Sequence, residues 1–122
     1  MTDDRERKIH ELKDKIKEFC DVREWDKYHN AKDLAIGLSI EASELLEIFL
    51  WKNPEEVENL FVDEKKREHI EEEMADIFYF LIRLSEKYNI DLSQAIDKKL
   101  EKNNQKYPVE KVKGLNKKYN EY

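Results

Sequence analysis

The sequence predicts an all-α protein built as a four-helix bundle, and two observations support this fold class. Only 2 of the 122 residues are glycine and 2 are proline, so few positions interrupt helices. Apolar side chains also recur at intervals of three and four residues, which is the period of an amphipathic helix. Because 43% of the residues are charged and 39% are hydrophobic, the core is modest, and we expect an oligomer that buries apolar surface between subunits.

One domain is expected over residues 1–122, with its core at about 5–107 and a basic C-terminal tail at 108–122. The first helix is expected to begin near Thr2, which is a residue type that caps helices. Its apolar stripe consists of Ile9, Leu12, Ile16 and Phe19. Polar and aromatic residues at 23–34 then predict a structured loop that leads into the second helix.

The second helix is expected at about residues 32–51. Its apolar stripe consists of Leu34, Leu38, Leu45 and Ile48. The Asn53-Pro54 pair ends it, because proline lacks a backbone donor and restricts the residue before it. A short helical turn is expected after this proline, at residues 55–61.

The third helix is expected at about residues 63–88, with Asn89 as its C-terminal signal. Its apolar positions are Ile70, Met74, Ile77, Leu81 and Leu84. A fourth helix is expected to start with Ser93 as its cap and to continue to about Lys106, where Pro108 prevents further extension. Four helices with short connections are expected to pack as a bundle.

Four carboxylates occupy core or core-edge positions of the second and third helices. Glu41 lies within the apolar stripe of the second helix and Glu44 flanks it, while Glu73 and Asp76 repeat this arrangement on the third helix. A buried carboxylate is costly without a cation, so these four are candidate ligands for Mg²⁺, with Mn²⁺ as an alternative. Glu47 is a candidate further ligand or general base. A single ExxE would indicate only a solvated acidic face, but its repetition in the same register indicates a metal site.

The charge is unevenly distributed along the chain. The net charge is −6, yet residues 98–122 carry eight lysines against three glutamates, a balance of +5, so the remaining residues carry −11. An acidic body and a basic C-terminal segment suit a metal-bound anion such as a nucleoside triphosphate, although lysines also simply solvate a terminal segment. The net negative charge disfavours non-specific binding of nucleic acid.

A cytoplasmic protein without a membrane partner is expected. Cys20 is the single cysteine, which excludes an internal disulfide, and it is expected to be a small buried residue. The charged N-terminus does not resemble a signal peptide, and no apolar run reaches membrane-spanning length.

Read in order, residues 19–119 resemble the MazG-like and dCTP pyrophosphatase type of all-α nucleoside triphosphate pyrophosphohydrolases. The paired ExxE and ExxD motifs of that family correspond to residues 41–44 and 73–76. The lead-in FxxxRxWxxFH is similar to residues 19–29, and the closing KxxxNxxKYPV matches residues 99–109. The joint match in this order is far more specific than ExxE alone.

The resemblance implies hydrolysis of a (deoxy)nucleoside triphosphate, dCTP or a modified pyrimidine analogue foremost, to monophosphate and pyrophosphate. It also implies a dimer or a dimer of dimers, and Mg²⁺ held by Glu41, Glu44, Glu73 and Asp76. Lys99 and Asn103 would contact phosphate and sugar, and aromatic residues would surround the nucleobase. The full set of expected substrate-binding residues is Trp25, His29, Lys32, Trp51, Phe80, Lys99, Asn103, Lys106 and Tyr107.

Three positions depart from the family pattern. Asp33 replaces the usual asparagine, Leu50 replaces a glutamine, and Phe80 stands where a tyrosine is common. The neighbouring Tyr79 is expected to point about 100° away on the helix.

Two alternatives stay open: the same chemistry on dUTP or phosphoribosyl-ATP, and a non-catalytic helical protein that binds partners through its acidic stripe. A di-iron bundle is disfavoured because its Glu-x-x-His pairs are absent from the two acidic motifs.

Overall fold

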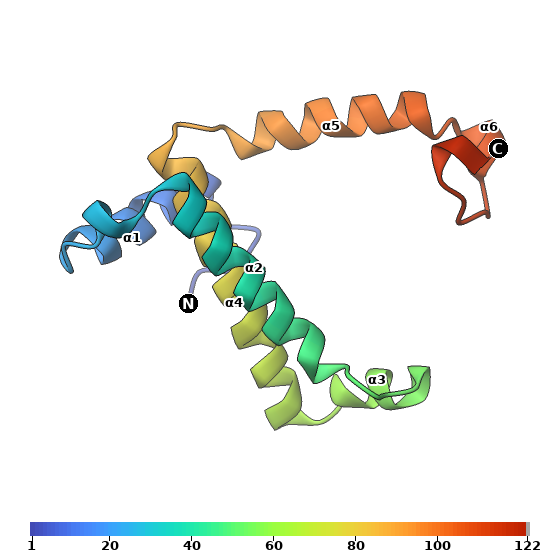
Figure 1. The fold of residues 1–122 in the computed structure, drawn as a ribbon, viewed down its shortest axis with the longest axis horizontal. Coiled ribbons are helices and arrows are strands. Elements are labelled where there is room, and N and C mark those ends of the chain that lie inside the picture. The colour runs from blue at the N-terminus through green and yellow to red at the C-terminus, as the bar shows by residue number, and fades with distance from the viewer. Residues whose placement is uncertain (122) are drawn as a thin grey trace. The chain divides into compact units, whose positions relative to one another are not determined.

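The computed structural model describes residues 1–121, and every regular element in this range is helical, which confirms the all-α fold class (Figure 1). The chain divides into two compact units, Met1–Asn89 and Ile90–Tyr122. Tyr122, the last residue of the predicted tail, lies outside the described residues. That both units belong to a single domain stays a prediction.

The first unit is organised around a pair of long helices. Its elements are α1 (Ile9–Asp21), a 3-10 turn (Asp26–Tyr28), α2 (Ala31–Ile48), α3 (Pro54–Leu60) and α4 (Glu64–Lys87). Figure 1 shows α2 and α4 side by side, and α1 also packs against α4. The two helices that carry the predicted carboxylate pairs are therefore direct neighbours.

The predicted start of the first helix at Thr2 is wrong, because α1 begins at Ile9. The Asp3 carboxylate accepts the backbone N–H groups of Arg5 at 2.9 Å and Glu6 at 3.2 Å, and so closes a separate turn. Lys8 is extended, and the Glu11 carboxylate accepts its backbone N–H at 2.8 Å. The hydrogen bonds to Asp3 thus close an isolated turn. The helix itself starts at a separate cap, in which Glu11 accepts the backbone N–H of Lys8.

Polar side chains set the starts of the other helices in this unit. Asn30, Asn53 and Asp63 each accept the backbone N–H of the residue three positions later, which satisfies a donor that a helix start leaves unpaired. Helix α2 ends at Ile48, a little earlier than predicted, and Pro54 opens α3 at the position where proline suits a helix. The second and third predicted helices are confirmed.

The buried apolar core of the first unit is small. Its members are Cys20, Leu34, Leu60, Ile70 and Ile82. Burial of Cys20 is as predicted, but Met74 and Leu81, which were expected in the stripe of the third helix, are exposed in this single chain. Their apolar surface is available to another molecule.

Helix α2 and the side chain of Phe80 on α4 approach each other closely at Gly37. A Cβ atom added at Gly37 would lie 2.5 Å from Cε1 of Phe80, which is far inside van der Waals contact. Glycine is therefore required at this position for the observed packing of the Phe80 ring.

The second unit contains α5 (Leu92–Lys106), α6 (Val109–Val112) and a 3-10 turn (Tyr119–Glu121). Asp91, and not Ser93 as predicted, caps α5, because its extended backbone lets its carboxylate accept the N–H of Gln94 at 2.9 Å. Among residues 1–121, no helix combines the length and apolar character needed to cross a bilayer.

Candidate metal centre and adjoining cavity

Packing of α2 against α4 brings the predicted carboxylates together. One oxygen atom each from Glu41, Glu73 and Asp76 lies within 4.8 Å of the others. Ligands on opposite sides of Mg²⁺ are about 4.2 Å apart, given metal–oxygen distances of about 2.1 Å. Small side-chain rotations would therefore bring these three oxygens around one ion.

Two oxygens in this cluster lack a partner. Oε2 of Glu41 and Oε2 of Glu73 are buried and accept no hydrogen bond from the described residues. Glu73 as a whole is only 9% exposed. Buried acceptors of this kind are destabilising unless a donor or a cation meets them. The orphaned oxygens thus fit a bound metal ion.

The electrostatics of the cluster lead to the same conclusion. Burial, together with the neighbouring carboxylates of Glu44 and Asp76, raises the pKa of Glu41 to about 7. Burial and Glu44 also raise the pKa of Glu73 above its usual value. Like charges that share a site disfavour full ionisation, and a divalent cation removes that penalty. The acidic cluster is therefore suited to a metal, and Glu44 belongs to it through its effect on both neighbours.

A cavity of about 470 Å³ adjoins the cluster. Its lining consists of Lys15, Ile16, Phe19, Trp25, Glu41, Asp76, Tyr79 and Phe80. Carboxylates thus line part of the cavity and aromatic rings line much of the rest, in a volume typical of small-ligand sites. The sequence predicted Trp25 and Phe80 here. It did not identify Lys15, Ile16 and Phe19 as site residues, because α1 contributes them only through packing, or Tyr79 on α4.

The aromatic wall of this cavity is a chain of edge-on contacts. The Phe19 ring lies 5.8 Å from that of Trp25 and 6.1 Å from that of Tyr79, between ring centroids. Tyr79 in turn lies 5.1 Å from Phe80. Tyr79 and Phe80 lie on different sides of α4, in line with the expected offset of about 100° on the helix. Tyr79 faces α1, with its hydroxyl oxygen 3.3 Å from Sγ of Cys20, while Phe80 faces α2, and both line the cavity.

A second cavity, of about 460 Å³, is lined by residues from the same two helices. Its lining consists of Glu44, Glu47, Ile48, His69 and Glu73. The structure therefore brings Glu47 together with two of the predicted metal ligands. His69 was assigned no role from the sequence, although its position four residues before Glu73 places both on one helix face.

Other predicted contact residues of the first unit lie apart from these cavities. His29 is half-buried in the loop before α2, and its Nδ1 accepts a hydrogen bond of 3.0 Å from Nε of Arg83. Lys32 is exposed, 3.9 Å from the Asp33 carboxylate. Within residues 1–121, Trp51 lines neither cavity and is 92% exposed.

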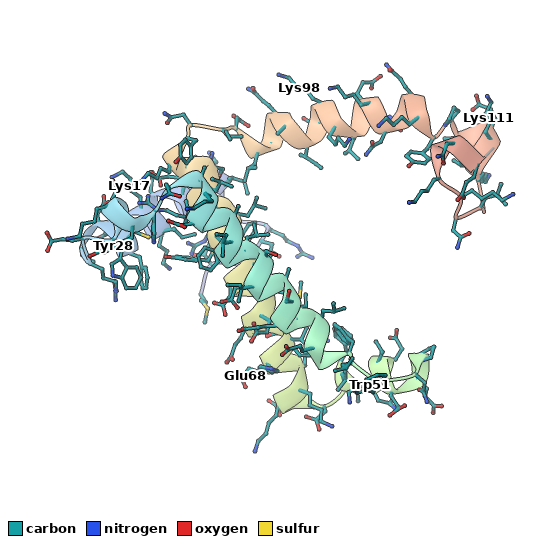
Figure 2. All side chains as sticks on the ribbon, in the orientation of Figure 1. Lys17, Tyr28, Trp51, Glu68, Lys98 and Lys111 are labelled. Atoms are coloured by element: carbon teal, nitrogen blue, oxygen red, sulfur yellow. The ribbon has the colours of Figure 1, made fainter. Side chains whose placement is uncertain are left out.

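Trp51 also lies far from the loop that holds Trp25. Figure 2 shows Tyr28 of this loop and Trp51 at opposite ends of α2. Because α2 has 18 residues, its ends are about 27 Å apart. The structure of one chain therefore does not bring Trp51 to the cavity that Trp25 lines.

The remaining predicted substrate-binding residues belong to the second unit. Lys99, Asn103 and Lys106 follow one another on α5 at intervals of four and three, so they share a helix face. Tyr107 follows as the C-cap, and its backbone N–H donates to the carbonyl of Asn103 at 2.8 Å. Their roles toward a substrate stay predictions.

Comparison with known proteins places these features in a family context. The sequence profile of the MazG-like family matches residues 36–122. The chain is 34% identical to dCTP pyrophosphatase 1 from Mus musculus over 102 residues. These aligned residues cover 84% of this chain and 60% of the mouse protein. The corresponding protein from Homo sapiens is 30% identical over 104 residues, 85% of this chain and 61% of its own length. The chain thus spans about three fifths of the length of the curated relatives it matches.

A solved structure is also similar to this chain. It is the crystal structure of a pyrophosphatase from Archaeoglobus fulgidus, with 43% sequence identity and a TM-score of 0.74. The similarity covers 82% of this chain and 92% of the archaeal chain.

Proposed function

Because this chain belongs to the MazG-like family, we propose that it hydrolyses a (deoxy)nucleoside triphosphate to the monophosphate and pyrophosphate. One observation above all supports this reaction: two orphaned carboxylate oxygens lie in an acidic cluster, and a member of that cluster lines an aromatic cavity. Our preferred substrate is dCTP or a modified pyrimidine analogue, since the mouse and human relatives are named dCTP pyrophosphatase 1. Free nucleotides of this kind would place the reaction in the cytoplasm.

The metal of this proposal is Mg²⁺, with Mn²⁺ as an alternative. Glu41, Glu44, Glu73 and Asp76 would hold it, because hard divalent ions prefer carboxylate oxygens. When bound, such an ion neutralises phosphate charge and makes an attacking water more acidic.

Side chains of the protein supply the remaining functions. The Glu47 carboxylate is our candidate for accepting the proton of the attacking water, since it shares a cavity with Glu44 and Glu73. Trp25 and Phe80 offer ring faces for a nucleobase.

The second unit carries groups that suit the rest of the nucleotide. In our proposal Lys99 and Lys106 neutralise the triphosphate, and Asn103 hydrogen-bonds the sugar. Hydrolysis at the α-phosphorus then releases pyrophosphate.

A homodimer or a dimer of dimers forms part of the proposal. Exposed apolar side chains along α2 and α4 support it: Ile36, Ile40, Met74, Phe78 and Leu81. Patches of this kind are typical of subunit interfaces. Because a single chain does not bring Trp51 to the cavity, any contact of Trp51 with a nucleotide there would come from a second copy. Light scattering coupled to size-exclusion chromatography tests the oligomeric state.

A nucleotide panel with Mg²⁺, followed by chromatography of the products, tests the reaction. The panel includes dCTP, 5-methyl-dCTP, dUTP and phosphoribosyl-ATP. Monophosphate with pyrophosphate is the expected outcome, whereas diphosphate with phosphate would contradict the proposed cleavage. If the folded protein hydrolyses no nucleotide, the hypothesis of a non-catalytic helical protein that binds partners replaces the proposed function. That hypothesis also predicts little Mg²⁺-specific thermal stabilisation, whereas a metal site stabilises the folded protein by mass action.

A further inference from the structure

Arg83 is a buried cation that connects α4 to the loop between α1 and α2. Only 1% of its surface is exposed. Its Nε donates to Nδ1 of His29 at 3.0 Å, and its Nη2 donates to Oδ1 of Asp26 at 2.8 Å. Its Nη1 donates to the carboxylate of Glu86 on the same helix. Two of the three guanidinium nitrogens therefore hold loop residues.

Two neighbouring residues hold the same loop. Nζ of Lys87 donates to the backbone carbonyl of Asp26 at 2.8 Å and lies 3.2 Å from its carboxylate. The hydroxyl of Tyr88 accepts the backbone N–H of Ala31 at 2.8 Å. The C-terminal end of α4 is thus bonded to this segment at Asp26, His29 and Ala31, and Trp25 lies directly before the first of these points.

The contact with Arg83 defines the protonation state of His29. A guanidinium nitrogen acts only as a donor, so Nδ1 of His29 has to be an acceptor. In the neutral ring the proton then resides on Nε2. Burial and the positive charges of Arg83 and Lys87 lower the pKa of His29, against a smaller opposing effect of Asp26. His29 therefore has a single hydrogen-bond donor, and its ring lies 6.3 Å from that of Trp25 between centroids.

We propose that Arg83 is a positioning residue of the nucleotide site, which fixes His29 as the Nε2–H tautomer and holds Trp25 at the cavity wall. His29 does not itself line the cavity, but its single donor then has a fixed direction beside the ring of Trp25, which does line it. A nucleobase that packs on Trp25 and has a carbonyl oxygen at its edge, as pyrimidines have, matches this arrangement. This inference rests on the proposed function for the identity of the ligand.

Nitrogen NMR of the ligand-free protein tests the tautomer directly. The chain has 3 histidines, so long-range proton–nitrogen spectra are readily assigned by substituting His10 and His69. At neutral pH we expect His29 to show a protonated Nε2 and an unprotonated Nδ1. A proton on Nδ1, alone or in an imidazolium ring, overturns the inference. This measurement is made on the folded protein and does not depend on enzymatic activity.

Kinetics of Arg83→Met test the consequence for the substrate. On a nucleotide that the wild type hydrolyses, we expect KM to rise about tenfold while kcat falls by less than about threefold, because nucleobase binding loses its aligned partners. Arg67→Met is the matched control, since Arg67 lies on the same helix but contacts residues near it in the chain, Glu71 at 3.2 Å and the backbone carbonyl of Phe61 at 3.3 Å. The control should keep the wild-type KM.

Arg83→Lys separates position from charge. Lysine keeps the positive charge but cannot reproduce the forked donor geometry, so KM should stay raised. A wild-type KM in folded Arg83→Met, or full rescue by lysine, overturns the role of Arg83. Absence of all turnover in the wild type would instead refute the proposed function, and the His29 tautomer would still decide whether Arg83 acts on that ring.

Discussion

Replacing Gly37 with alanine tests whether the Phe80 ring packs against α2 in a way that shapes the cavity. The new Cβ would lie 2.5, 2.7 and 2.9 Å from three atoms of the Phe80 ring. Carbon atoms in contact are normally about 3.5–4.0 Å apart, so the ring has to move by about 1 Å. Because Phe80 lines the cavity, this movement changes the proposed nucleobase wall.

The net effect on stability follows from two opposing terms. Overpacking of this kind costs about 1–3 kcal/mol. The change from glycine to alanine within a helix contributes about 1 kcal/mol in the other direction. We therefore expect Gly37→Ala to lower the free energy of unfolding by about 0–2 kcal/mol and to raise KM for the nucleotide. Each kcal/mol corresponds to a few degrees in Tm, about 3–6 °C for a chain of this size.

Urea unfolding and steady-state kinetics on two further variants complete this test. Ala42→Gly, at an exposed position of α2, measures the helix-propensity term without a clash. Gly37→Ala combined with Phe80→Leu relieves the clash, so the pair should be less destabilising than the sum of the single changes. If Gly37→Ala alone were more stable by about 1 kcal/mol with an unchanged KM, the close packing would be refuted.

Three further predictions concern the metal site and the exposed tryptophan. Glu44→Ala should abolish turnover while its far-UV circular dichroism stays that of the wild type. Glu68→Gln, at an exposed position of α4, is the control that should stay active. Retained activity in Glu44→Ala would refute the metal assignment. In metal-free protein the raised pKa of Glu41, about 7 against 4.5 when unfolded, means that the folded state holds the proton more tightly. The free energy of unfolding should therefore fall as pH rises from about 4.5 to 7, and Mg²⁺ should suppress this fall; urea titrations at pH 5 and 8 that show a rise would contradict it. Trp51→Ala should leave Tm almost unchanged, because the side chain is 92% exposed, yet raise KM if a second copy brings it to the cavity. An unchanged KM would argue against that contribution.

Features that depend on neighbouring residues in the chain were predictable. The intervals of the apolar side chains located α2 and α4, and the proline at position 54 marked the break between α2 and α3 correctly. The i,i+3 spacing of Glu41 with Glu44, and of Glu73 with Asp76, is likewise local, so both pairs were identified as candidate ligands. Capping was less predictable, because Asp3 and Asp91 compete with nearby side chains for the same backbone donors.

Periodicity and composition are properties of short segments, so they were enough to predict the helices and the residues able to bind a metal. Which residues these side chains contact depends on the packing of distant segments. Arg83 contacts His29 across 54 positions of the chain, and Tyr79 reaches Cys20 across 59. Trp25 and Phe80 share a cavity while Trp51 lies beyond the end of α2. Such contacts depend on how α1 and α2 pack on α4, and packing between distant segments leaves no periodic signal in the sequence.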